Sequence, residues 1–426
     1  MSPSFDRSYA EQQDRDDPLS SFRAAFYFPK RANDTPVVYL CGHSLGLQPK
    51  DARRVLNEEL DAWAELGVDA HFDSKRPWVS FHERLAPSLA QLAGALPSEV
   101  VAMNSLTVNL HLMLASFYRP RGARAKILIE QRAFSSDRYA VRSHLAQRGI
   151  DPATAVVEVE PRFEEDTFYT DDICELIANR ADEIALVLLP GIQYLTGQCF
   201  DMERISATAR KHGCFVGFDL AHAMGNVPLK LHDWGADFAV WCGYKYLNGG
   251  PGAIGGCFVH ERHGTAFELP RFAGWWGHDK RSRFAMPDAF QPLPGAEGWQ
   301  LSNPSIFAAA PLLASLEQFD RAGIDTLRAR SIRLTGYLEL LLGTWLGEDV
   351  DILTPSNIEA RGCQLSLRLN KPANEARAIH ERLSRAGYIC DWREPDVIRV
   401  APVPLYNTFV DVWAFADALK RLCSSA

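Results

Sequence analysis

Lys245 stands between an apolar run and a glycine-rich turn, in the segment WCGYKYLNGGPGAIGG. Glycines allow positive φ angles and let the backbone approach a ligand closely. A lysine that is withdrawn from water has a lowered pKa and can act as an amine nucleophile. An isolated lysine beside a loop is more often a solvated surface residue, so the interpretation depends on the other polar residues of the chain.

Two further polar features precede this lysine. Asp219 ends the apolar run CFVGFD, His222 follows three residues later, and a buried carboxylate at that point requires a partner. In NSLTVNLHLMLASF, a helix can begin at Asn104, Ser105 or Thr107. Its apolar face would consist of Leu110, Met113, Leu114 and Phe117. The start of a helix offers free N–H groups and a partial positive charge, which together favour an anion.

The order of these features matches the needs of pyridoxal phosphate (PLP). Its phosphate binds at a helix start, its pyridinium nitrogen pairs with a carboxylate, and its aldehyde reacts with a lysine. The residues therefore predict a Schiff base between Lys245 and PLP. No GxGxxG run follows an early strand, which argues against a dinucleotide site. Asp219 and His222 alone are too few ligands for zinc, so no metal is predicted.

Alternating strands and helices would position these residues. Strands are predicted at 126–130, 155–160, 184–189, 214–219 and 238–242, of which 184–189 is a continuous apolar run, and helices are predicted at 137–147 and 202–213. Units of this length predict an α/β fold with a mostly parallel central sheet and helices on both faces. Ligands of such sheets bind beyond the carboxyl ends of the strands, where Asp219 and Lys245 stand.

The last hundred or so residues differ in pattern. Strands are expected at 361–369, 388–394 and 397–403, with helices at 374–387 and at 408–423, the latter capped by Thr408. These predict a smaller α+β domain at 326–426. An N-terminal arm and segment, 1–60, would pack with it, since chain ends often lie close together, and 61–325 would form the large PLP-binding domain. A helix is also predicted at about 50–67, with Val55, Leu56, Leu60 and Trp63 on one face.

Composition excludes several classes of function. The net charge is −8 and the arginines are scattered, which argues against a nucleic-acid partner. No apolar run approaches the roughly 18–20 residues of a membrane span, and no secretory leader is recognisable. Nine cysteines without a CxxC pair favour a reducing compartment, so a cytoplasmic location is expected.

Short runs spread over about 44–407 resemble the kynureninase family of fold-type I PLP enzymes: SLGLQPK, KRPW, NSLTVNLH, FSSD, YLTGQ, DLAHAMGN, GYKYLNGGPG, GWWGH, LSNP and IRVAPVPLYN. The resemblance implies hydrolysis of the Cβ–Cγ bond of L-kynurenine or 3-hydroxykynurenine. The products would be L-alanine and anthranilate or 3-hydroxyanthranilate, within tryptophan and kynurenine metabolism. It also implies a homodimer with the active site at the subunit interface.

The resemblance also implies residue roles. Lys245 would bind the cofactor and move the α-proton, Asp219 would pair with the pyridinium nitrogen, and Tyr244 would bind phosphate and act in acid–base catalysis. Arg399 would bind the substrate α-carboxylate, and His71 would lie near the substrate's aromatic ring. The other cofactor contacts would be Leu106, Thr107, Phe134, Ser135, Ser136, Asp137, His222, Trp275 and Asn303, the last two partly from the partner subunit. Asn303 would also contact substrate.

Two positions depart from the family pattern, and two alternatives stay open. His43 stands where the family often has Asn, and Pro190 stands where it often has Ser or Thr, so a hydroxyl near the cofactor is absent or comes from Thr196. A cysteine desulfurase-like PLP lyase would need a nucleophilic cysteine; Cys363 is the candidate, although its strand pattern indicates burial. A catalytically silent PLP-binding scaffold is the other alternative, and the presence of Lys, Asp, Tyr and Arg together counts against it.

Overall fold

The computed structural model describes residues 5–31 and 34–424. Its main sheet has seven strands in the order β2-β8-β7-β6-β5-β3-β4. The bounds are β2 (Val100–Ala102), β3 (Lys126–Glu130), β4 (Val156–Val159), β5 (Ile184–Pro190), β6 (Phe215–Asp219), β7 (Phe238–Trp241) and β8 (Gly256–Val259). Only β8 runs against the others, since it is antiparallel to both of its neighbours. The predicted, mostly parallel central sheet is confirmed.

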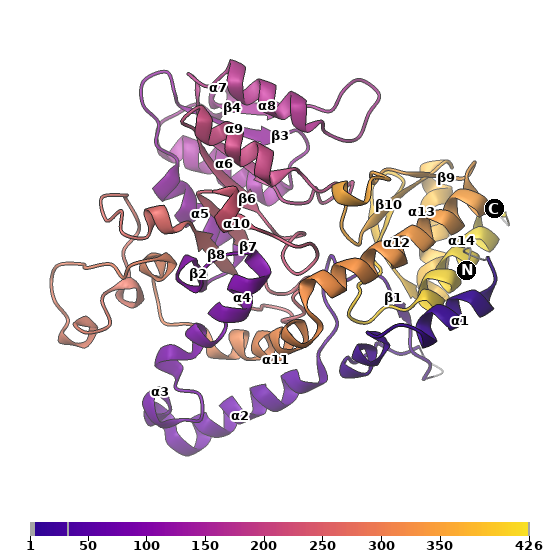
Figure 1. Cartoon of the computed structure of the whole chain (residues 1–426), viewed down its shortest axis with the longest axis horizontal. Helices are drawn as coiled ribbons and strands as arrows, with labels where there is room; N and C mark the ends of the chain where they lie inside the picture. Colours follow the sequence, from indigo (N-terminus) through magenta and orange to yellow (C-terminus); the bar gives the residue numbers. More distant parts are fainter. Residues whose placement is uncertain (1–4, 32–33, 425–426) are drawn as a thin grey trace.

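Helices cover both faces of this sheet (Figure 1). On β5, Leu186 and Leu188 join the core formed with α5 (Leu106–Phe117) and α6 (Ser135–Gln147). The alternate residues Val187 and Leu189 join the core on the other face, with α8 (Thr170–Asn179) and α9 (Met202–Lys211). A strand that is apolar on both faces must be buried on both, which explains the continuous run IALVLL. The shorter helices are α3 (Ala70–Asp73), α4 (Ala86–Ala93), α7 (Pro152–Ala155) and α10 (Leu231–Trp234).

A second, antiparallel sheet has the order β12-β13-β10-β9. Its strands are β9 (Val350–Ile352), β10 (Leu365–Leu369), β12 (Asp391–Arg393) and β13 (Val397–Val400). A separate core packs them against α12 (Ile324–Leu346), α13 (Ala373–Arg385) and α14 (Phe409–Ser424). The hydroxyl of Thr408 accepts a hydrogen bond from the Asp411 N–H at 3.0 Å, so the predicted helix cap is confirmed.

The N-terminal segment lies beside this smaller sheet region (Figure 1). The carboxylate of Asp14, in α1 (Arg7–Arg15), accepts hydrogen bonds from the first N–H groups of α14, at 2.7 Å from Phe409 and 3.0 Å from Val410. Strand β1 (Val38–Tyr39) pairs with β11 (Tyr388–Ile389). The proposed boundaries at 60 and 325 stay predictions.

Helix α2 (Lys50–Leu66) forms where the sequence predicts it and packs against α11 (Ile306–Ala322). Val55 is buried, but Leu60 and Trp63 are 42% and 58% exposed. The rest of the chain therefore covers only part of the apolar face of α2 and leaves Leu60 and Trp63 largely exposed. Among the described residues, no helix combines the length and the apolarity needed to cross a bilayer.

Candidate active site

The carboxyl ends of β6 and β7 bring three of the predicted residues together. Asp219 is the last residue of β6, and its Oδ1 accepts a hydrogen bond from the Ala221 N–H at 2.7 Å. Lys245 follows β7 by four residues, and its Nζ lies 3.0 Å from Nε2 of His222. Burial and the charge of Lys245 hold the pKa of His222 well below its usual value. His222 is thus a neutral partner that accepts the lysine's hydrogen bond.

Asp137, in the first turn of α6, is buried beside Asp219. Burial, followed by the charge of Asp219, raises the pKa of Asp137 well above its usual value. Burial also raises the pKa of Asp219, but the Ala221 N–H and Lys245 oppose that shift. Asp137 therefore carries the proton, and Asp219 remains the anion that can face a cationic ring nitrogen.

The N-termini of α5 and α6 meet at the same end of the sheet. The hydroxyl oxygens of Thr107 and Ser136 lie 2.8 Å apart. Neither helix has a side-chain hydrogen bond from its N-cap residue, so first-turn N–H groups remain for an acceptor. A Cβ at Gly255 would lie 2.6 Å from the Trp241 carbonyl oxygen and 3.4 Å from the Leu106 nitrogen, so this backbone passes close to the helix start. The donors suit a phosphate.

Two aromatic residues flank the lysine. Phe134, directly before α6, is 43% exposed, and its ring centroid lies 5.9 Å from the Lys245 Nζ. It can therefore stack on a ring that is bound at the lysine. Burial, and then the neighbouring Cys242 thiol, raise the pKa of Tyr244 to about 12, so its phenol keeps a proton that it can donate at neutral pH. Phosphate site, carboxylate, lysine and stacking face together form a donor set that fits PLP.

Arg399, on β13, is buried near these groups, and its charge contributes to the lowered pKa of His222. Its Nε donates to Asp391 Oδ2 at 2.6 Å, and its Nη1 donates to the Tyr194 carbonyl oxygen at 2.5 Å. Neither partner was recognised from the sequence. Asp391 falls in a short, half-buried strand, where an aspartate gives no pattern that distinguishes it from a solvated residue.

Three of the predicted residues lie away from the cluster around Lys245. His71, in α3, places its Nδ1 3.0 Å from the Val68 carbonyl oxygen. The Trp275 indole donates to the Arg283 carbonyl oxygen at 3.0 Å, and Asn303 is exposed in the segment before α11. The structure does not bring these three residues into the cluster around Lys245.

The departures and the desulfurase candidate have clear locations. Pro190 ends β5 in register with Asp219, and the Thr196 hydroxyl accepts a hydrogen bond from the Gln198 N–H at 3.3 Å.

Cys363 is fully buried, and burial raises the pKa of its thiol to about 12. A nucleophilic cysteine needs an accessible thiol with a lowered pKa, so Cys363 is unsuited to the chemistry of a desulfurase.

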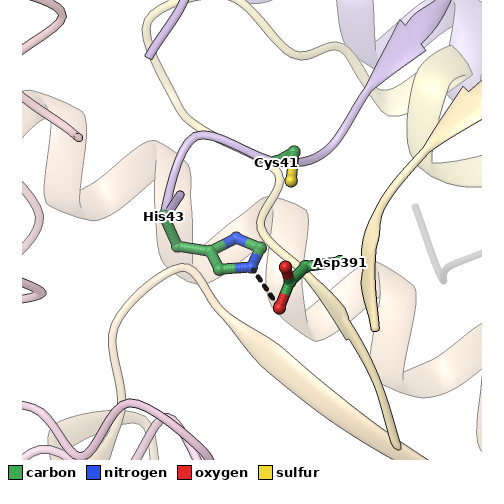
Figure 2. Close-up of side chains that lie close together, drawn as sticks. All are labelled: Cys41, His43 and Asp391. Carbon is green, nitrogen blue, oxygen red and sulfur yellow. Dashed lines mark ion pairs between the residues drawn. The ribbon is translucent and has the colours of Figure 1, made fainter. Parts of the chain in front are cut away.

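His43 predicts a pH dependence of stability. Its ring is fully buried next to Asp391 (Figure 2), and burial, with the charge of Arg399, lowers its pKa from 6.5 to about 3. Between these values the unfolded chain binds a proton that the folded chain refuses, so stability falls as the pH drops below 6.5. This single residue should cost about 2 kcal/mol between pH 6.5 and 5.

Urea unfolding of the wild type and of His43→Asn at the two pH values tests this prediction. The variant should lose about 2 kcal/mol less stability than the wild type over the same interval. An equal loss in both proteins would show that another group is responsible.

Comparison with known proteins decides the family. Residues 327–419 match the family model described as the kynureninase C-terminal domain. A kynureninase from Myxococcus xanthus is 55% identical over 97% of this chain and 96% of its own length. One from Xanthomonas oryzae pv. oryzae is 54% identical over 99% of both chains. The chain belongs to the kynureninase family. The resemblance seen in the sequence is confirmed over nearly its whole length.

Comparison with solved structures identifies the fold of this kynureninase family member. A cysteine desulfurase from Escherichia coli superposes with a TM-score of 0.76 at 19% identity, over 96% of this chain and 98% of its own. A C-DES variant with glycine covalently linked to the PLP cofactor gives 0.76 at 18% identity, over 90% and 96%. At such identities the likeness concerns the fold alone, and the predicted fold-type I architecture is confirmed.

Proposed function

We propose that this chain is a PLP-dependent hydrolase that cleaves L-kynurenine, 3-hydroxykynurenine or both. The products are L-alanine and anthranilate or 3-hydroxyanthranilate. The observation that carries the proposal is the 54–55% identity with kynureninases over nearly the full length. The meeting of Lys245, His222 and Asp219 at the carboxyl ends of neighbouring strands supports the same chemistry.

The residues around Lys245 would hold the cofactor in a fixed orientation. The N-terminal turns of α5 and α6, which include Leu106, Thr107 and Ser136, would bind the phosphate. Asp219 would pair with the ring nitrogen, and Phe134 would cover the ring face. PLP, when bound, provides the electron sink that accepts the electron pair released at the substrate Cα.

The chain's own side chains would move the protons. Lys245 removes the α-proton of the substrate, and neutral His222 accepts a hydrogen bond from the lysine without adding a competing charge. Tyr244 keeps its proton at neutral pH and can supply it where the carbonyl of the substrate is attacked. One water molecule is consumed: its hydroxyl joins the aromatic acyl group, and a proton joins Cβ as the bond breaks.

Arg399→Leu should chiefly weaken substrate binding. The guanidinium is a buried cation whose charge acts on His222, the hydrogen-bond partner of the lysine, and carboxylates bind guanidinium groups through paired, charge-assisted hydrogen bonds. The loss should raise KM for kynurenine by about 10-fold to 100-fold, with a smaller change in kcat.

Steady-state kinetics of this variant should be compared with those of Arg368→Leu. Arg368 lies on neighbouring β10 and pairs with Asp166, so the control removes an arginine from the same sheet. An unchanged KM in Arg399→Leu would refute the proposed role of Arg399 in binding the substrate carboxylate.

A product assay tests the proposed function. Purified protein loaded with PLP should release equal amounts of anthranilate and alanine from L-kynurenine. A parallel reaction with 3-hydroxykynurenine gives the substrate preference. L-cysteine in place of kynurenine should give no sulfide, since Cys363, the candidate nucleophile of a desulfurase, is fully buried and its thiol has a raised pKa. Sulfide release without anthranilate would overturn the proposal in favour of a desulfurase-like lyase.

The proposal extends to assembly and location. A homodimer is supported by the positions of Trp275 and the exposed Asn303, which lie outside the cluster in one chain, and by the exposed Trp63 on α2. A cytoplasmic location in the kynurenine pathway is supported by the cysteines, all of which are free thiols.

A further inference from the structure

Asp391, on the half-buried strand β12, is the centre of a cluster of charged groups, of which Arg399 is buried and Arg393 is partly exposed. Its Oδ2 accepts hydrogen bonds from Nε of Arg399 at 2.6 Å and from Nε of Arg393 at 2.9 Å, and Nη2 of Arg399 contacts the same oxygen. Figure 2 shows the imidazole of His43, from the segment after β1, pointing at this carboxylate; its Nε2 lies 3.9 Å from Oδ2. Two guanidinium groups therefore share one carboxylate.

The charges in the cluster do not cancel. Both arginines are cations and Asp391 is the one anion that they share: burial acts to raise its pKa, but the neighbouring His43 and the charges of Arg399 and Arg393 hold that pKa well below the usual range. His43 is neutral. One positive charge is left over next to a guanidinium whose side chain is 1% exposed. The Arg393 side chain is 36% exposed and can be solvated, but the buried Arg399 guanidinium cannot, so an ion of opposite sign is favoured beside Arg399 and the cluster suits one additional monoanion.

The same charges argue against a metal ion. Cys41, His43 and Asp391 offer a sulfur, a nitrogen and an oxygen atom within 4.8 Å of one another (Figure 2). A dication at this point would add two positive charges to a cluster that already has a surplus of them. Asp391 would also have to give up both arginines to bind it. The cluster is better suited to recognise a carboxylate than a cation.

We propose that Asp391 is a positioning residue that fixes the guanidinium of Arg399 for the α-carboxylate of the substrate. This inference depends on the proposed function, in which Arg399 binds that carboxylate. Asp391 holds the Nε–Nη2 edge and the Tyr194 carbonyl holds Nη1, so these contacts use three of the five guanidinium N–H groups. The other two are left for a carboxylate in the plane that Asp391 sets.

Asp391→Asn tests this role, because asparagine keeps the shape of the side chain and removes its charge. The variant should raise KM for kynurenine by about 10-fold to 100-fold and should change kcat by less than about threefold. Inhibition by 2-aminoacetophenone, which has the aryl ketone of the substrate and no carboxylate, should be unchanged. Asp166→Asn is the matched control, since it removes one carboxylate from the partly exposed pair with Arg368.

A double-mutant cycle separates positioning from a general structural effect. If Asp391 acts through Arg399, Asp391→Asn should change KM by less than about threefold in an Arg399→Leu background. Equal effects in both backgrounds would overturn the inference. The absorbance of the bound cofactor should be the same in all of these variants, because Asp391 is not among the groups proposed to hold PLP.

The outcomes distinguish the two proposals. A wild-type protein that releases no anthranilate from kynurenine would defeat the proposed function itself. An active wild type together with an unchanged KM in Asp391→Asn would defeat only the positioning role. Should the asparagine variant fail to fold, Asp391→Glu keeps the charge and moves it by one methylene group. Its KM should rise by a smaller factor, and a wild-type KM there would also contradict the inference.

Discussion

Replacing Lys245 with alanine is expected to lower the turnover of kynurenine by more than about 1,000-fold. In the proposed mechanism the same amine binds the cofactor and moves the α-proton, so its removal deletes both covalent and acid–base catalysis. His222, whose Nε2 lies 3.0 Å from the Lys245 Nζ, has no primary amine and cannot form the Schiff base in its place. The measurement is anthranilate release by protein that has been saturated with PLP.

Lys230→Ala provides the control for this variant. Lys230 is exposed before α10, so its loss should leave turnover unchanged. The spectrum gives a second readout, because the alanine variant should lack the absorbance of lysine-bound PLP even where PLP remains in the site. Near-normal anthranilate release by Lys245→Ala would remove the lysine from the mechanism.

Asp219→Asn should be the second most damaging change, lowering kcat by about 100-fold to 10,000-fold. Removal of one partner of a buried ion pair costs about 3–5 kcal/mol, and each 1.4 kcal/mol corresponds to a factor of ten. Asparagine is neutral and cannot keep the ring nitrogen protonated, so the cofactor would lose its strength as an electron sink. The affinity for PLP, measured by titration of the apoprotein, should fall as well.

Asp137→Asn tests the assignment of protons between the two carboxyl groups. Burial and the charge of Asp219 keep Asp137 protonated, and asparagine has nearly the shape of that neutral form. The expected loss in kcat is therefore less than about tenfold, well below that of Asp219→Asn. If Asp137→Asn were the more damaging variant, the anion would have to be assigned to Asp137 instead.

The sheet could be predicted from the sequence because its strands are local features. IALVLL is apolar along its whole length, KILIE and CFVGFD are apolar except for charged residues at their ends, and the three runs form β5, β3 and β6 within a residue or so of the expected bounds. The direction of β8 was not predicted. It depends on how the turn after Lys245 folds back, and a run of four residues contains no information about that.

The candidate site was predictable only in part, for a related reason. Asp219 and Lys245 follow strands that are adjacent in the sheet, so their order along the chain determines that they meet. The partners of Arg399 come from segments far apart in the sequence: Tyr194 from the loop after β5, and Asp391 from β12. No periodicity or spacing connects these segments, and only tertiary packing brings them together.

The most direct test of a PLP enzyme built on Lys245 is borohydride reduction of the purified holoprotein, followed by digestion and mass spectrometry. Reduction should bleach the yellow colour, attach the cofactor to the peptide that contains Lys245 and abolish anthranilate release in the same sample. Attachment to a different lysine, or full activity after Lys245 has been modified, would contradict the account.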